Sequence, residues 1–138
     1  MSEPPATLVD SNVLLDLLTR DEKWQSWSSE ALERAADNGP LVINAVIFAE
    51  VSVGFSRIED IEAALPVDQF VRAPLPWPAA FLAGRCHLRY RREGGTKTST
   101  LPDFFIGAHA AVSRLRLLTR DVGRYRTYFP TVDLLAPA

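Results

Sequence analysis

Thr7-Leu8-Val9-Asp10-Ser11 is the stretch that decides the fold, because a short apolar run stops there at a carboxylate. Apolar runs of this length are typical of buried strands. Ser11 can cap a helix that continues to Leu18. Similar runs recur along the chain: strands are expected at 7–9, 41–43, 69–72, 115–119 and 131–135, and helices at 11–18, 21–37, 44–55, 58–65, 78–93, 101–114 and 122–128. Strands separated by helices predict an α/β fold, in which helices cover both faces of a parallel sheet of about five strands.

The length and composition indicate one domain. With 138 residues, 47% of them hydrophobic, the chain can bury a core without metal or disulfide support. We expect a single domain over residues 1–138, with residues 1–6 as a disordered lead-in. One cysteine, Cys86, rules out an intramolecular disulfide and favours a cytoplasmic setting. No apolar run is long enough to cross a membrane.

Charge is unevenly distributed along the chain. Residues 1–84 carry 5 basic and 13 acidic side chains, whereas residues 85–126 carry 10 basic and 3 acidic ones. Two interpretations remain open. The arginines can lie on scattered solvated helix faces, or they can form one basic surface that follows a phosphate backbone.

Four acids occupy positions where a parallel sheet binds its ligands. Asp10 follows the first expected strand and Asp121 the fourth, and ligands bind at the carboxyl ends of such strands. Glu50 and Asp103 lie on expected helices that could lean over the same edge. Glu50 is the only charged residue between Leu41 and Ser56. Because burying an unpaired carboxylate is costly, an acid in such an apolar helix usually faces a cleft or a cation.

Each of the four acids also has a purely structural interpretation. Glu50 could be an ordinary exposed glutamate on an amphipathic helix, and the other three acids could be caps. Asp10 and Asp121 could each cap the helix or turn that follows. Thr100-Leu101-Pro102-Asp103 resembles a capping box, with the carboxylate at the third helical position. Each of the three is weak support for a site, and their shared placement is stronger.

A cluster of four carboxylates needs a proton or a cation. Two carboxylates about 4 Å apart repel by about 4 kcal/mol at an effective dielectric constant near 20. Oxygen ligands favour Mg²⁺ or Mn²⁺ over zinc. Such an ion lowers the pKa of bound water and stabilises charge on a phosphodiester. We therefore expect Asp10, Glu50, Asp103 and Asp121 to hold one or two Mg²⁺ or Mn²⁺ ions.

Four segments resemble the motifs of PIN-domain nucleases, in order and over nearly the whole chain. They are Val9-Asp10-Ser11-Asn12-Val13-Leu14-Leu15-Asp16, Ala49-Glu50-Val51, Leu101-Pro102-Asp103-Phe104-Phe105-Ile106-Gly107-Ala108-His109-Ala110, and Leu117-Leu118-Thr119-Arg120-Asp121. The length is similar to that of VapC toxins of toxin–antitoxin pairs. The resemblance implies a three-layer α/β/α fold of strand order 3-2-1-4-5 and an Mg²⁺- or Mn²⁺-dependent endoribonuclease.

The same resemblance assigns site residues and partners. Asp10, Glu50, Asp103 and Asp121 match the metal-binding acids, and Asn12 and Thr119 match polar residues that support them. It implies a homodimer, a VapB-type antitoxin that inserts a basic side chain into the acidic site, and a structured RNA target such as tRNA or rRNA. Many relatives have a further acid where this chain has Val122-Gly123-Arg124-Tyr125, which leaves the number of ions open. Trp24 and Trp27 could line the antitoxin groove, but we expect them to pack in the core.

Two other functions fit parts of the pattern. A phosphatase could use Asp10 as its nucleophile, although it would not explain Glu50 and would expect an acid in place of Asn12. A non-catalytic PIN-like module could bind RNA or protein without cutting. The segment 94–99 lacks the glycine spacing of a phosphate loop, and two histidines are too few for a zinc site.

Overall fold

The structure, a computed structural model, describes residues 4–97 and 100–138. The first half of the expected disordered lead-in, residues 1–3, lies outside this range, as do residues 98–99 of the expected loop at 94–99. Five strands form one sheet in the order β3-β2-β1-β4-β5, and all four pairings are parallel. The strands are β1 (Thr7–Val9), β2 (Leu41–Ile43), β3 (Phe70–Arg72), β4 (Arg116–Leu118) and β5 (Leu134–Leu135). The predicted α/β class, strand number and strand order are confirmed.

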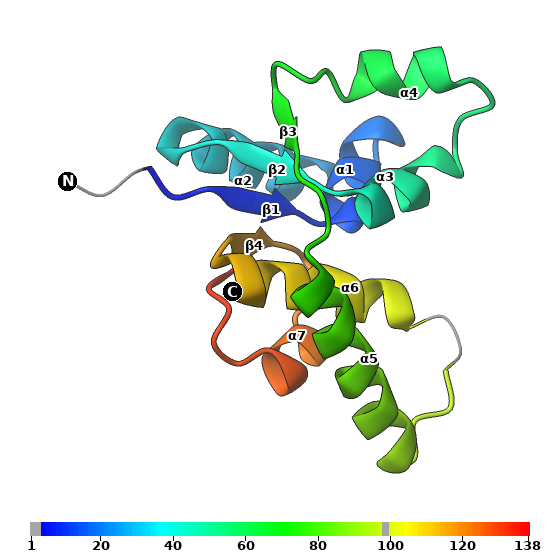
Figure 1. The fold of residues 1–138 in the computed structure, drawn as a ribbon. Coiled ribbons are helices and arrows are strands. Elements are labelled where there is room, and N and C mark those ends of the chain that lie inside the picture. The colour runs from blue at the N-terminus through cyan, green and yellow to red at the C-terminus, as the bar shows by residue number, and fades with distance from the viewer. Residues whose placement is uncertain (1–3, 98–99) are drawn as a thin grey trace.

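In the part of the chain that the structure describes, seven helices connect and cover the strands. They are α1 (Ser11–Leu18), α2 (Gln25–Asn38), α3 (Ala45–Ser52), α4 (Ile58–Ala64), α5 (Trp77–Arg92), α6 (Leu101–Ser113) and α7 (Gly123–Tyr128). Figure 1 shows α1 to α4 on one side of the sheet and α5 to α7 on the other. Right-handed crossovers produce this division. The chain moves across the sheet in one direction from β1 through β2 to β3, and in the opposite direction from β3 through β4 to β5. The strand order therefore reverses between β1 and β4.

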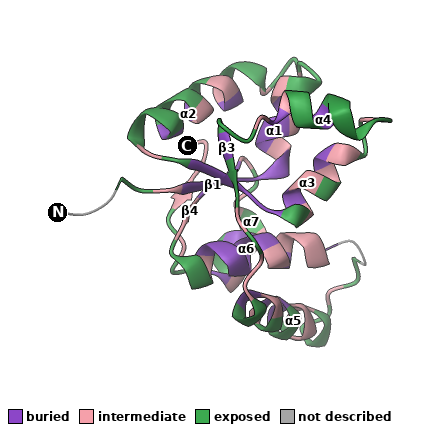
Figure 2. Ribbon diagram, turned by 45° about the horizontal axis from the view of Figure 1, so that its top comes forward, coloured by how far each residue is buried: buried purple, intermediate pink, exposed green. Residues whose placement is uncertain are grey.

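The centre of the sheet is the most deeply buried part of the molecule. Leu8, Val9, Leu117 and Leu118 of β1 and β4 are all fully buried, and the purple segments in Figure 2 trace this core. Phe104 of α6 is the largest fully buried side chain among the described residues. In the same residues, no helix is both long enough and apolar enough to cross a membrane.

Several element boundaries differ from those expected. α2 begins at Gln25 rather than near residue 21, because the Asp21 carboxylate accepts hydrogen bonds from the backbone N–H groups of Lys23 and Trp24 and forms a turn. The last strand is limited to Leu134–Leu135, because a turn closed by the N–H of Val132 takes up the residues before it.

The two tryptophans of the α2 region have different surroundings. Trp27 is half-buried and packs against the core, as expected. Trp24 is also half-buried, but it contacts the edge of the Trp27 ring and two cations, since the Lys23 amine and the Arg120 guanidinium lie 5.4 and 5.3 Å from its ring centroid. The expected core position is thus met by Trp27 alone.

Candidate active site

Asp10 lies where the strand order reverses, directly after β1. Its backbone N–H donates to the carbonyl of Leu118 in β4, so both strand ends are fixed at this point. One carboxylate oxygen, Oδ1, accepts the N–H of Ser11 at 2.8 Å, and Asp10 rather than Ser11 is the N-cap of α1. The interpretation of Asp10 as a helix cap is therefore correct. It is compatible with a role in the site, because capping uses only one of the two carboxylate oxygens.

The second oxygen of Asp10 is surrounded by hydrogen-bond donors. Oδ2 accepts from the hydroxyl groups of Tyr125 at 2.8 Å and Thr119 at 2.9 Å, and from the amide of Asn12 at 3.3 Å. Burial raises the pKa of Asp10 to about 6, although the bonds from Tyr125 and Thr119 lower it and the charges of Asp103 and Glu50 raise it further. The charged form of Asp10 is therefore poorly stabilised by the protein alone.

Glu50 reaches the site from α3 and shares a hydroxyl with Asp10. The Ser11 Oγ donates to Glu50 Oε1 at 2.9 Å and lies 3.4 Å from Asp10 Oδ1. Burial raises the pKa of Glu50, and Asp103 raises it further against the lowering effect of the Ser11 bond. Among the described residues, Glu50 thus has a hydroxyl partner, and the cation that its apolar helix led us to expect is not found beside it.

A buried polar pair joins the helices that carry Glu50 and Asp103. Asn44 caps α3 by accepting the N–H of Ile47 at 2.9 Å, and its amide nitrogen lies 3.0 Å from Nδ1 of His109 in α6. Burial lowers the pKa of His109, so the ring is neutral and accepts the amide hydrogen. His109 is thus a packed residue, and its contact with Asn44 links α6 to the start of α3.

Asp103 lies in the first turn of α6 and forms an ion pair with Arg124. The Arg124 Nη1 donates to Asp103 Oδ2, and the two side chains are 21% and 32% exposed. Burial raises the pKa of Asp103, Arg124 lowers it and Asp121 raises it. The capping-box interpretation is wrong, because Thr100 makes no side-chain cap and its buried hydroxyl has no partner among the described residues.

Asp121 is the most exposed of the four acids. Its backbone N–H donates to Thr119 Oγ1 at 3.1 Å, while its carboxylate takes part in none of the hydrogen bonds found among the described residues. The interpretation of Asp121 as a cap is wrong, because α7 begins after Val122 without a side-chain cap. Its charge nevertheless raises the pKa of Asp103, which places it beside the other acids.

A buried ion pair holds the segment between Thr119 and Asp121 in place. Arg120 donates from Nε and Nη2 to the two oxygens of Asp16, at 2.8 and 3.0 Å, and Ser28 adds a hydroxyl at 2.7 Å. Asp16 is only 2% exposed. The segment that carries Thr119 and Asp121 is thereby tied to α1, which begins at Asp10.

The acids surround a common space without closing on one point. Among residues 4–97 and 100–138, no three Asp, Glu, His or Cys side chains are close enough together to hold one ion. Asp103 interacts electrostatically with all three other acids. Its charge raises the pKa values of Asp10 and Glu50, and the charge of Asp121 raises the pKa of Asp103. Mg²⁺ usually takes one or two carboxylates and completes its shell with water. This oxygen-only set fits such an ion, with Arg124 already neutralising part of the charge of Asp103.

The basic residues of the second half do not form one surface. Arg120 is paired with Asp16, Arg124 with Asp103, and Arg89 with Glu93. Arg116 begins β4 and therefore lies at the opposite edge of the sheet from the acids. The basic residues whose charges lower the pKa of Asp103 are Arg124 of α7 and Lys97, which follows α5.

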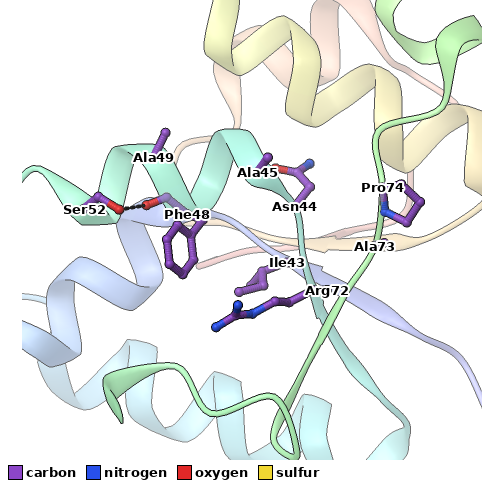
Figure 3. Close-up of a pocket in the computed structure, with 9 residues that line it drawn as sticks. All are labelled: Ile43, Asn44, Ala45, Phe48, Ala49, Ser52, Arg72, Ala73 and Pro74. Carbon is purple, nitrogen blue, oxygen red and sulfur yellow. Dashed lines mark hydrogen bonds between the residues drawn. The ribbon is translucent and has the colours of Figure 1, made fainter. Parts of the chain in front are cut away.

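A groove lies beside α3, and none of the four acids lines it. Its volume is about 740 Å³, and it is lined by Ile43, Asn44, Ala45, Phe48, Ala49, Ser52, Arg72, Ala73 and Pro74. Figure 3 shows this face of α3, with Arg72 beside Phe48, where its guanidinium lies 5.0 Å from the ring centroid. Glu50 is not among the lining residues, because helical spacing turns it toward the other side of α3.

The sequence interpretation missed three contributors to the site. Ser11 links two of the acids, Tyr125 binds Asp10, and Arg124 binds Asp103. In the sequence, Arg124 and Tyr125 stood out only because they lie where many PIN-domain relatives have a further acid. A buried tyrosine hydroxyl and a half-buried arginine both need partners, but a single sequence does not say which residues supply them.

Comparisons with known proteins agree with this geometry. The PIN domain family model matches residues 7–130. Comparison with curated protein sequences gives no match. Among solved structures, the VapBC2 complex of Rickettsia felis, bound to a DNA fragment from its promoter, matches at a TM-score of 0.72 and 16% identity, over 96% of this chain and 99% of that one. A toxin–antitoxin complex from Klebsiella pneumoniae matches at 0.60 and 26%, over 86% and 89%. With a family match that covers most of its length, the chain belongs to the PIN domain family.

Proposed function

We propose that this protein is a metal-dependent endoribonuclease that acts as the VapC-type toxin of a type II toxin–antitoxin pair. The observation that carries the proposal is the environment of Asp10. A buried carboxylate with its pKa raised to about 6 faces two further carboxylates at the switch point of the sheet. Carboxylates held together in this way at a ligand-binding edge are suited to a divalent cation.

Each proposed site residue has a role that follows from its contacts. Asp10, Glu50, Asp103 and Asp121 would hold one or two Mg²⁺ ions, with Mn²⁺ as a substitute. Bound metal would supply an activated water and neutralise charge on the phosphodiester. Asn12 and Thr119 donate to Asp10 Oδ2, so they would keep its other lone pairs directed at the site.

The structural neighbours support a toxin with a protein antagonist. The complexes from Rickettsia felis, Haemophilus influenzae and Klebsiella pneumoniae are toxin–antitoxin or VapBC structures. We therefore assign to this chain a VapB-type antitoxin as its partner, and a structured cytoplasmic RNA, of the tRNA or rRNA class, as its substrate. An antitoxin that inserts a basic side chain among the four acids would block the site by charge pairing.

Two exposed aromatic residues support the proposed homodimer. Trp77 and Phe81 lie one turn apart at the start of α5 and are 87% and 72% exposed. Large aromatic side chains are rarely left in water together unless another surface covers them. We assign this surface to the second copy of the chain.

The phosphatase alternative receives no support from the structure. Asp10 is 3% exposed, and Oδ2 already accepts three hydrogen bonds. A phosphatase of this kind would also expect an acid at the position of Asn12, and Asn12 instead donates a hydrogen bond to Asp10. The non-catalytic alternative remains an outcome of the experiment below.

The test is cleavage of total tRNA and rRNA by the purified full chain. Mg²⁺ or Mn²⁺ should support cutting, EDTA should stop it, and Asp103→Asn should lower the rate at least about hundredfold. Asp37→Asn, at an exposed position near the end of α2, is the matched control and should cut like wild type. RNA binding without turnover in any divalent metal would contradict the proposal and favour the binding module.

A further inference from the structure

Arg124 places a permanent positive charge inside the group of acids. Its guanidinium binds Asp103 and lies 5.5 Å from the ring centroid of Tyr90 and 5.8 Å from that of Phe104. An arginine that is paired with a carboxylate and packed on aromatic rings is held in one position. The next residue, Tyr125, donates to Asp10, so one turn of α7 contacts two of the four acids.

The charge of Arg124 limits how many ions the site can take. Together the acids Asp10, Glu50, Asp103 and Asp121 carry four formal negative charges, and Arg124 cancels one of them. A single divalent ion would cancel two more. A second one would give the group a net positive charge and would have to approach the guanidinium, which repels it.

The geometry leaves both partners of the pair free to bind something else. Asp103 uses Oδ2 for Arg124, and Oδ1 has no hydrogen-bond partner among the described residues. A guanidinium has five N–H donors, and the hydrogen bond to Asp103 uses only one of its nitrogens. Planar guanidinium groups bind phosphate oxygens two at a time. Asp103 can thus bind an ion on one side while Arg124 faces a phosphate on the other.

We propose that Arg124 is the second cation of this site, taking the place of a second divalent ion beside Asp103 and contacting the phosphate of the RNA substrate. The inference rests on the proposed nuclease function and adds to it a fixed stoichiometry of one divalent ion per chain.

Titration of the full chain with Mn²⁺ alone, followed by electron paramagnetic resonance or calorimetry, tests the stoichiometry without RNA. Wild type should bind one Mn²⁺, and Arg124→Glu should bind two. Arg126→Gln, exposed on the same helix, is the matched control and should bind one. Two ions on wild type, or one ion on folded Arg124→Glu, would overturn the inference.

A second variant covers the case in which Arg124→Glu fails to fold. Arg124→Gln keeps a long polar side chain but removes the charge, so it should bind the first Mn²⁺ roughly tenfold more tightly. Unchanged affinity would count against Arg124 as a cation of the site.

Cleavage assays separate a catalytic role from an inhibitory one. Arg124→Lys keeps the charge but loses the planar fork, and we expect one Mn²⁺ per chain with cleavage reduced about tenfold; Arg124→Gln should lose about hundredfold. If both variants cut RNA faster than wild type, Arg124 inhibits cleavage and the inference is wrong. A protein that binds one Mn²⁺ but cuts no RNA would refute the proposed function and leave the stoichiometry intact.

Discussion

Replacing Asp10 with asparagine should abolish activity and remove a loss of stability that Asp10 imposes as the pH approaches neutrality. The folded-state pKa of Asp10 is about 6, against an ordinary value of 3.8, so the native state holds this proton more tightly than the unfolded chain. Stability linked to the proton is fully present below the unfolded value of 3.8 and is lost as the pH rises through 6. At about 1.4 kcal/mol per pH unit, this shift corresponds to about 3 kcal/mol by pH 7.

Asp10→Asn cannot titrate and is therefore free of this loss. Urea unfolding of both proteins, followed by circular dichroism from about pH 4 to pH 7 in EDTA, should show the variant gaining about 3 kcal/mol relative to wild type. EDTA is needed because a bound ion would itself lower the pKa of Asp10. The reasoning fails if the stability difference stays constant within about 1 kcal/mol over this range or changes in the opposite direction.

Three further predictions concern the surroundings of the site. Tyr125→Phe removes a hydrogen bond that lowers the pKa of its carboxylate partner, so Mn²⁺ binding measured against pH should begin at higher pH than in wild type. Asp16→Asn leaves Arg120 without its charged partner and should lower the free energy of unfolding by about 2 kcal/mol in urea titrations, with the Tm reduced accordingly. Replacing Trp77 and Phe81 with serine should weaken the dimer about hundredfold or more in sedimentation experiments, while Tm changes little because both side chains are exposed.

Local sequence patterns predicted much of the sheet. Short segments with two or three consecutive apolar residues, set between helical segments, located all five strands, because buried parallel strands have few polar positions. The boundaries were less predictable. The start of α2 depends on a side-chain turn at Asp21, and the short β5 depends on the turn before it, and both compete with the regular pattern.

Within the site, the sequence predicted the acids better than their contacts. Glu50 was identified by its apolar surroundings, which is a local signal. The pairing of Asp103 with Arg124 joins residues 21 positions apart on two helices, and that of Asp10 with Tyr125 joins residues 115 apart. Such pairings depend on how α6 and α7 pack on the sheet, and hydrophobic periodicity does not encode this.

The insertion of β4 beside β1 has a consequence for the synthesis of the protein. Asp10 obtains its partners Thr119 and Tyr125 only after the ribosome has translated beyond residue 125, because β4 and α7 supply them. A nascent chain that ends at Asp103 carries three of the four acids, but it still lacks β4, the strand that pairs with β1 next to Asp10. The hydrogen bonds that fix Asp10 therefore form in one late step of synthesis, and under the proposed function the nascent chain would not cut RNA before that step.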